Sequence, residues 1–297
     1  MKKEVSIVLF LLFLHLTAKA VEVKVDHVFY NADSDTQTAE VIRAEAGYEG
    51  PITIPEEFTA WSKSYRVISI ADNAFRGNSG ITSVSIAESV TSIGGAAFCD
   101  CKSLIAADLP ESVKLIGRDA FKRCTSLPSI KLSSNLETID IGAFGSCESL
   151  TSVVIPNGVT TVGSSAFYGC LALITIDFPE SVASLGTYGV IDYCPAMTDC
   201  YFHHTTPLNI TAETFHESTR QQLTLHVPSG CKAQNATAEY WKDFKEIIDD
   251  IPTTGILPVL TKQDAESYYD LQGNRLDKTR LPQNSIVIHH GKKYVVK

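Results

Sequence analysis

Apolar residues recur every 23 positions through the middle of the chain. Consecutive windows of equal length begin at Ile68, Thr91, Lys114, Glu137 and Thr160, with no insertion between them. One column holds phenylalanine in every window, and the column before it holds alanine. The phenylalanine column is Phe75, Phe98, Phe121, Phe144 and Phe167. A fixed period of this length predicts a repeat solenoid, in which each unit buries its apolar side against its neighbours.

Each window contains two short segments that we expect to be extended, such as residues 150–155 and 159–162. Stacking like segments on one another predicts parallel β-strands along the solenoid axis. A glycine follows the second segment in four copies, which indicates a backbone bend that a side chain would obstruct. These glycines are Gly94, Gly117, Gly163 and Gly186. Asp140 breaks the column, so we expect a local distortion there.

The repeat also carries a recognisable motif. Ile-Gly-x-x-Ala-Phe-x-x-Cys-x-x-Leu-x-x-Ile-x-Leu, as at residues 116–132, closely resembles the BspA-type leucine-rich repeat. The resemblance extends to an N-terminal cap and to a closing segment at residues 227–244. It implies a right-handed repeat stack. Many members of this family are exported bacterial surface proteins that take part in adhesion to host matrix, epithelium or other microbes. The resemblance therefore also implies an exported bacterial surface protein.

The first twenty residues differ from the rest of the chain and predict a signal peptide at residues 1–20. A basic start precedes the apolar run Val5–Leu16, and Ala18-Lys19-Ala20 fits a small-x-small cleavage site. The alternative is a membrane anchor, but the run is shorter than the roughly 20 residues that cross a bilayer. We therefore expect a secreted or bacterial cell-surface protein with no transmembrane segment.

The remaining chain divides into five predicted parts. Residues 21–67 form an N-terminal β cap, with a strand at 21–28, a turn at 31–35 and a strand from Thr38. The solenoid covers residues 68–205, with five regular repeats at 68–182 and an irregular remainder in which Val190 replaces the phenylalanine. Residues 206–251 are a degenerate repeat and C-terminal cap that ends in a short helix at 243–250. A linker follows at residues 252–264.

Residues 265–297 predict a C-terminal β-hairpin module, with His290-Gly291 as its two-residue turn. The module resembles short C-terminal β modules of exported proteins from anaerobic gram-negative bacteria, some of which are secretion or sorting signals. The alternative is a small sheet that packs on the solenoid and ends the chain.

Half of the eight cysteines recur at the repeat period, at Cys101, Cys124, Cys147 and Cys170. Rungs about 4.8 Å apart would hold their Cβ atoms slightly too far apart for a relaxed disulfide. We expect a ladder of buried thiols that serve as small apolar filler. Cys194 and Cys200 are placed where they could pair, whereas Cys99 and Cys231 have no evident mate.

Charge and motifs exclude several functions. The net charge is −9, and removal of the signal leaves 22 basic and 33 acidic residues, a net charge of −11. Such a chain has no basic run to neutralise phosphates, so nucleic acid is not an expected partner. No phosphate loop, nucleophile elbow or metal-ligand spacing occurs, so we expect no cofactor, no metal and no enzymatic activity.

The outward positions of the first extended segment are the candidate binding residues. Two rows of side chains point away from the core there, because side chains alternate along a strand. The candidates are Ser83, Ser85, Asp108, Ser129, Lys131, Ser152, Val154, Thr175 and Asp177. We expect them to contact an extracellular protein or glycan, from host matrix or another microbe, as part of a monomer. The alternative is a merely solvated face on a structural or accessory envelope module without a ligand of its own.

Overall fold

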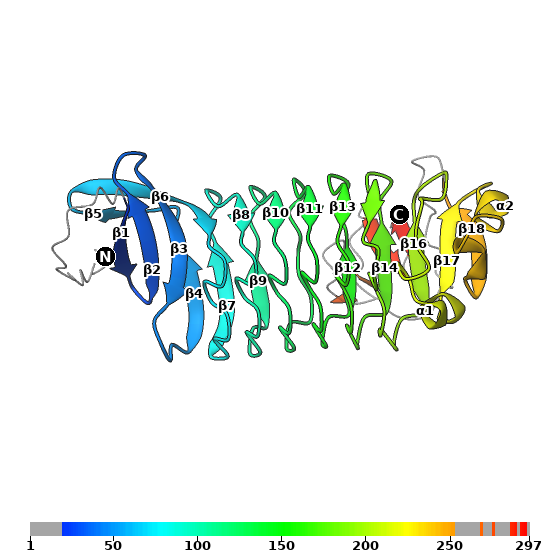
Figure 1. Cartoon of the computed structure of the whole chain (residues 1–297), viewed down its shortest axis with the longest axis horizontal. Helices are drawn as coiled ribbons and strands as arrows, with labels where there is room; N and C mark the ends of the chain where they lie inside the picture. The colour runs from blue at the N-terminus through cyan, green and yellow to red at the C-terminus, as the bar shows by residue number, and fades with distance from the viewer. Residues whose placement is uncertain (1–19, 253–267, 270–274, 277–285, 290–291, 296–297) are drawn as a thin grey trace.

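The chain folds as a parallel β-solenoid whose rungs follow one another along one long axis (Figure 1). The computed structural model describes residues 20–252 and the tail strands at 268–269, 275–276, 286–289 and 292–295. The solenoid predicted from the repeat is confirmed. The predicted signal peptide and the predicted linker lie outside the described residues, apart from Ala20 and Pro252 at their ends.

One row of strands runs without a break along the solenoid. It consists of β6 (Lys63–Ile70), β8 (Ser92–Ile93), β10 (Leu115–Ile116), β11 (Thr138–Ile139), β13 (Thr161–Val162) and β15 (Ser184–Leu185). Each pairs in parallel with the next, and residues one repeat apart lie opposite each other, as Ile116 and Ile139 do. The 23-residue period therefore sets the register of the row.

A second row forms two sheets, separated in the middle of the array. The first sheet contains β4 (Gly50–Ile54), β7 (Ile81–Ile86) and β9 (Ala106–Asp108). The second contains β12 (Ser152–Val154), β14 (Thr175–Phe178), β16 (Asp199–Phe202), β17 (Thr224–Pro228) and β18 (Glu246–Ile251). Between them only a bridge from Asp108 to Lys131 remains.

Pro128 weakens the pairing of its rung with the preceding one. In neighbouring rungs the residue at this column donates its amide to the rung before, as Ile105 does to Thr82 at 2.9 Å and Ile174 does to Thr151 at 3.0 Å. Proline has no N–H to donate, so the bond to Ile105 cannot form. The carbonyl of Pro128 still accepts from Thr151 at 3.1 Å, so the stack continues on that side.

The N-terminal strands close one end of the stack. β1 (Ala20–Val25), β2 (Val28–Asp33) and β3 (Thr38–Ala44) form an antiparallel meander, and β3 pairs in parallel with β6. β5 (Glu57–Ala60) forms a hairpin with β6. The single strand predicted at 21–28 is wrong, because the chain turns at Asp26, whose φ is 52°.

The phenylalanine column lies at the centre of the core. Successive ring centroids from Phe75 to Phe167 are 5.0, 5.1, 5.5 and 5.4 Å apart, with interplanar angles of 15° or less. None of the five rings is more than 1% exposed. The prediction that these rings form one buried stack is confirmed.

The cysteine ladder is also confirmed. The thiols of Cys101, Cys124, Cys147 and Cys170 are fully buried, and each donates to the phenylalanine carbonyl of the preceding rung at 3.1–3.2 Å. Cys194 makes the same contact to Phe167 at 3.2 Å. All eight cysteines are free, so Cys194 and Cys200 do not pair. Burial raises the pKa of Cys147 to about 12, which keeps its thiol protonated.

Asp140 does not distort its rung in the way that the sequence predicts. Its amide donates to Ile116 at 3.0 Å, which matches the bond from Gly163 to Ile139 at 2.8 Å. The Asp140 carboxylate accepts from the amide of Ile141 at 2.6 Å. The ladder therefore passes through this rung in register.

A one-residue insertion marks the start of the irregular rungs. In regular rungs the phenylalanine amide donates to the next alanine, as Phe144 does to Ala166 at 2.8 Å, whereas Phe167 donates to Val190 at 2.9 Å. Val190 thus occupies the alanine column and Ile191 replaces the phenylalanine. The prediction that Val190 replaces it is wrong by one residue, because the extra residue lies before Val190 and not after it.

The C-terminal end is closed by short elements and one further strand. These are α1 (Glu217–Gln222), α2 (Lys232–Asn235), the 3₁₀ helix η1 (Trp241–Asp243) and β18. The helix predicted at 243–250 is wrong, since β18 pairs in parallel with β17. Trp241, Phe244 and Ile247 are each no more than 7% exposed and cover the last core layer, as expected.

The tail strands form a separate antiparallel sheet. Its order is β20 (Arg275–Leu276), β19 (Tyr268–Tyr269), β21 (Ile286–His289) and β22 (Lys292–Val295). β21 pairs with β22, with His289 opposite Lys292. The predicted turn residues His290 and Gly291 lie outside the described residues.

Candidate functional site

The predicted binding residues form one surface, which we call the outer face. Parallel pairing places Ser83 beside Ala106 in one row and Val154 beside Asp177 in the next. Ser85, Asp108 and Lys131 are exposed. The half-buried members are Ser83, Ser129, Ser152, Val154, Thr175 and Asp177. The alternating pattern therefore placed all nine outside the buried core.

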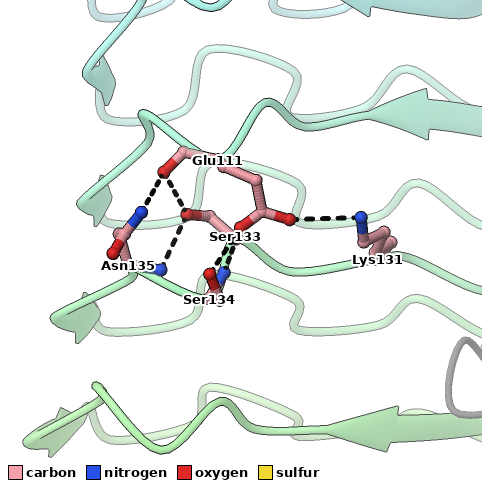
Figure 2. A network of polar contacts seen from close by, with 5 residues as sticks. All are labelled: Glu111, Lys131, Ser133, Ser134 and Asn135. Carbon is pink, nitrogen blue, oxygen red and sulfur yellow. Dashed lines mark hydrogen bonds and ion pairs between the residues drawn. The ribbon is translucent and has the colours of Figure 1, made fainter.

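Lys131 is held by the turn of the preceding rung (Figure 2). Its ammonium lies 3.1 Å from one oxygen of Glu111. The other carboxylate oxygen accepts from the amide of Ser134 at 2.6 Å and from its hydroxyl at 2.7 Å. The hydrogen bonds from Ser134, followed by Lys131, lower the pKa of Glu111. The ion pair is exposed, so it positions Lys131 more than it stabilises the fold.

Side chains and backbone extend this network across the rung. The Ser133 hydroxyl and the Asn135 side-chain amide both donate to the Glu111 carbonyl at 2.9 Å. The amide of Asn135 in turn donates to the Ser133 hydroxyl at 3.1 Å. The sequence analysis missed Glu111, although it lies one repeat before Ser134.

A cavity of about 580 Å³ lies at the C-terminal half of the outer face, and Val154 and Asp177 line it. The Asp177 carboxylate lies 2.8 Å from Nε2 of His203, which also lines the cavity. The described residues that complete its wall are Ile155, Asn157, Pro179, Glu180, Ser181, Thr205, Pro228, Ile251 and Pro252. The cavity combines apolar prolines with the polar pair Asp177–His203, a combination that suits an organic ligand group.

His226 joins three neighbouring strands, in the row that runs from Asp177 through Tyr201. Its Nε2 lies 3.0 Å from an Asp199 oxygen on β16, and its Nδ1 lies 2.9 Å from an Asp250 oxygen on β18. The Tyr201 ring stacks on it at 4.3 Å between centroids. Burial disfavours the charged imidazole, but the two carboxylates outweigh it and raise the pKa of His226. Because carboxylates only accept, the doubly protonated ring satisfies both contacts.

We expect the contacts of His226 with Asp199 and Asp250 to make the stability of the fold depend on pH. The folded-state pKa of His226 lies above its ordinary value of 6.5, so its contribution is fully present below that value and is lost as pH rises through the folded pKa. His226→Gln should therefore lower the melting temperature most at about pH 5 and least at about pH 9.

Melting curves of wild type and His226→Gln across this range check the expectation. His204 is buried with a lowered pKa and has the opposite pH dependence, but it is common to both proteins and cancels in the difference. A difference in melting temperature that does not change with pH would contradict the assignment.

The described part of the chain holds no group of three or more His, Cys, Asp or Glu side chains that could bind a metal ion. Among the same residues, no helix is both long and apolar enough to cross a bilayer.

Comparison with known proteins gives one family. The BspA type leucine-rich repeat region matches residues 68–198 in six copies. A solved leucine-rich repeat protein from Bacteroides ovatus is 29% identical, with a TM-score of 0.56 over 69% of this chain and 49% of its own. The T. pallidum leucine-rich repeat protein is 29% identical, with a TM-score of 0.54 over 61% of this chain and 81% of its own.

The chain thus spans about half the length of the Bacteroides ovatus protein. No curated protein matches it. The repeat motif, the parallel stack and both solved relatives agree, and the match extends beyond the five regular repeats to residue 198. Residues 68–198 of this chain are a BspA-type leucine-rich repeat region.

Proposed function

We propose that this chain is a non-catalytic binding module of an exported bacterial surface protein and contacts a protein or glycan ligand through the outer face. The observation that carries the proposal is the continuity of that face into the 580 Å³ cavity, at Val154 and Asp177. Repeat proteins commonly bind through extended surfaces of this kind. The family match supports a scaffold role, and the ligand itself is set by the outward side chains.

The chemistry of the outer face narrows the ligand class. Its small hydroxyl side chains leave the strand backbone accessible, and its charged members alternate in sign from Asp108 to Lys131. A net charge of −9 disfavours polyanions such as nucleic acid. A mixed polar surface beside a proline-lined cavity therefore fits a protein segment or a neutral glycan.

The signal-like start of the chain supports export. A location at the cell surface would place the outer face where matrix proteins, host glycans and other microbes are reachable. A partner in the bacterial envelope is the second candidate, in which case the chain is a structural module.

Charge reversal at Asp108 tests the outer face. Asp108 is exposed, so Asp108→Lys should leave the melting temperature unchanged. Residues 21–297 are first screened against immobilised matrix proteins, glycans and envelope extract. For the ligand found, we expect Asp108→Lys to weaken binding about tenfold, the effect of losing one well-placed polar contact.

Glu148→Lys is the matched control, because Glu148 is exposed outside the outer face and the change in charge is the same. Equal binding by Asp108→Lys and wild type would exclude this part of the outer face. Equal loss in both variants would show a general charge effect instead. Capture by envelope extract alone would favour the structural module.

A further inference from the structure

Three tyrosines lie in the turn segments that follow β13 and β15, outside the strands that carry the outer face. Tyr188 is 57% exposed and Tyr193 is 70% exposed, whereas Tyr168 is half-buried. The rings of Tyr168 and Tyr193 lie 5.0 Å apart between centroids, at an angle of 43°. The amide of Ser165, three residues before Tyr168, donates to the carbonyl of Tyr188 at 2.8 Å. We call Tyr168, Tyr188 and Tyr193 the tyrosine patch.

The patch departs from the repeat. In the rungs before Tyr168 its column holds Arg76, Cys99, Lys122 and Gly145. The left-handed position that Tyr193 occupies holds Gly77, Asp100, Arg123, Ser146 and Gly169 in the earlier rungs. Tyr188 lies in the segment that carries the one-residue insertion. These two columns hold no aromatic residue in the earlier rungs, and aromatic side chains gather only where the regular repeats end.

Folding does not account for Tyr193. Its φ is 58°, a left-handed conformation that costs free energy for a bulky side chain and that glycine adopts freely. A side chain that is 70% exposed recovers little of this cost by burial. Strained and exposed aromatic residues are typical of binding positions.

The charge behind the patch is negative. The Asp192 carboxylate is buried, where it accepts from the His216 amide at 2.9 Å and from the Thr219 hydroxyl at 2.7 Å. Burial, then Tyr193, Tyr188 and Asp192, raise the pKa of Tyr168. The electron-rich ring faces and the fixed carboxylate together favour a cation.

We propose that the tyrosine patch binds a lysine or arginine side chain from a basic segment of a partner protein. The inference rests on the proposed binding role but concerns a different surface. A basic partner also matches the net charge of −9. A glycan fits less well, because the two neighbouring rings are tilted by 43° and do not form a flat platform.

The double variant Tyr188→Ser/Tyr193→Gly tests the proposal, because it removes two rings without changing the charge. Glycine at 193 restores the residue found at Gly77 and Gly169, so the fold should hold. Calorimetric titration with hexalysine and with hexaarginine should show binding to wild type that is about tenfold weaker in the variant. Trp61→Gly is the control, since Trp61 is also exposed and has a φ of 47°.

Unchanged peptide affinity in the double variant, or no binding to wild type, would overturn the proposal. Binding of a neutral chitin hexasaccharide that the variant loses, without any effect on the peptides, would assign the patch to glycans instead. If the double variant has a lower melting temperature than wild type, the single variant Tyr193→Gly is titrated in its place. Removing the two rings should weaken peptide binding equally in the wild-type and Asp108→Lys backgrounds. A failure of the tyrosine-patch proposal can therefore be told apart from a failure of the binding role proposed for the outer face.

Discussion

Replacing Phe121 with alanine should lower the free energy of unfolding by about 3–5 kcal/mol. The ring is fully buried between Phe98, at 5.1 Å, and Phe144, at 5.5 Å. The backbone ladders fix the spacing of the rungs, so the cavity left by the ring cannot collapse. The loss is shared by two rung interfaces, because each repeat is stabilised by its neighbours.

Urea unfolding followed by circular dichroism measures this loss. Leu115→Ala is the matched control, because Leu115 lies in the same rung but is 40% exposed, and we expect it to cost less than about 1 kcal/mol. Similar losses in the two variants would contradict a closely packed phenylalanine stack.

Gly94→Ala should destabilise the protein by about 2–3 kcal/mol, whereas Gly95→Ala should be nearly neutral. A Cβ atom at Gly94 would lie 2.6 Å from backbone atoms of Ala71 and Asp72, which cannot move without opening the ladder. At Gly95 the nearest atom would be 3.4 Å away, an ordinary contact. The two substitutions are chemically identical and adjacent in sequence.

Thermal and urea unfolding of the two variants provide the comparison. The difference between them is independent of the conformational freedom that alanine removes from the unfolded chain, because both variants lose it. Equal stability of Gly94→Ala and Gly95→Ala would show that the rungs are not in such close backbone contact.

Much of the fold follows from the sequence because one repeat is copied. When a unit stacks on a copy of itself, a column in the sequence becomes a column in space. Phe75 to Phe167 and Cys101 to Cys170 were therefore placed correctly without any structure.

The irregular parts of the chain were harder to predict from the sequence, for a physical reason. A single extra residue before Val190 delays the cysteine column by one position, to Cys194, and the hydrogen bond from Phe167 shows that the extra residue lies before Val190. Residues 246–251 form β18 and not a helix because the open edge of β17 offers backbone partners. The pattern of apolar and polar residues within 246–251 cannot show that a strand edge is available to pair with them.

The candidate site divides in the same way. Strand alternation placed Asp108 and Lys131 on the outer face, whereas their partners come from neighbouring rungs. The contacts from Glu111 to Ser134 and from His226 to Asp250 join residues 23 and 24 positions apart. That spacing is the signal by which the sequence could have indicated them.

The most direct test of this account is a crystal structure of residues 21–297. We expect the rings of Phe75, Phe98, Phe121, Phe144 and Phe167 in one buried column at about 5.0–5.5 Å spacing, with Asp108 and Lys131 open to solvent on the outer face. Rings divided among separate domains or in contact with water would contradict the solenoid, and with it the binding role assigned to its surface.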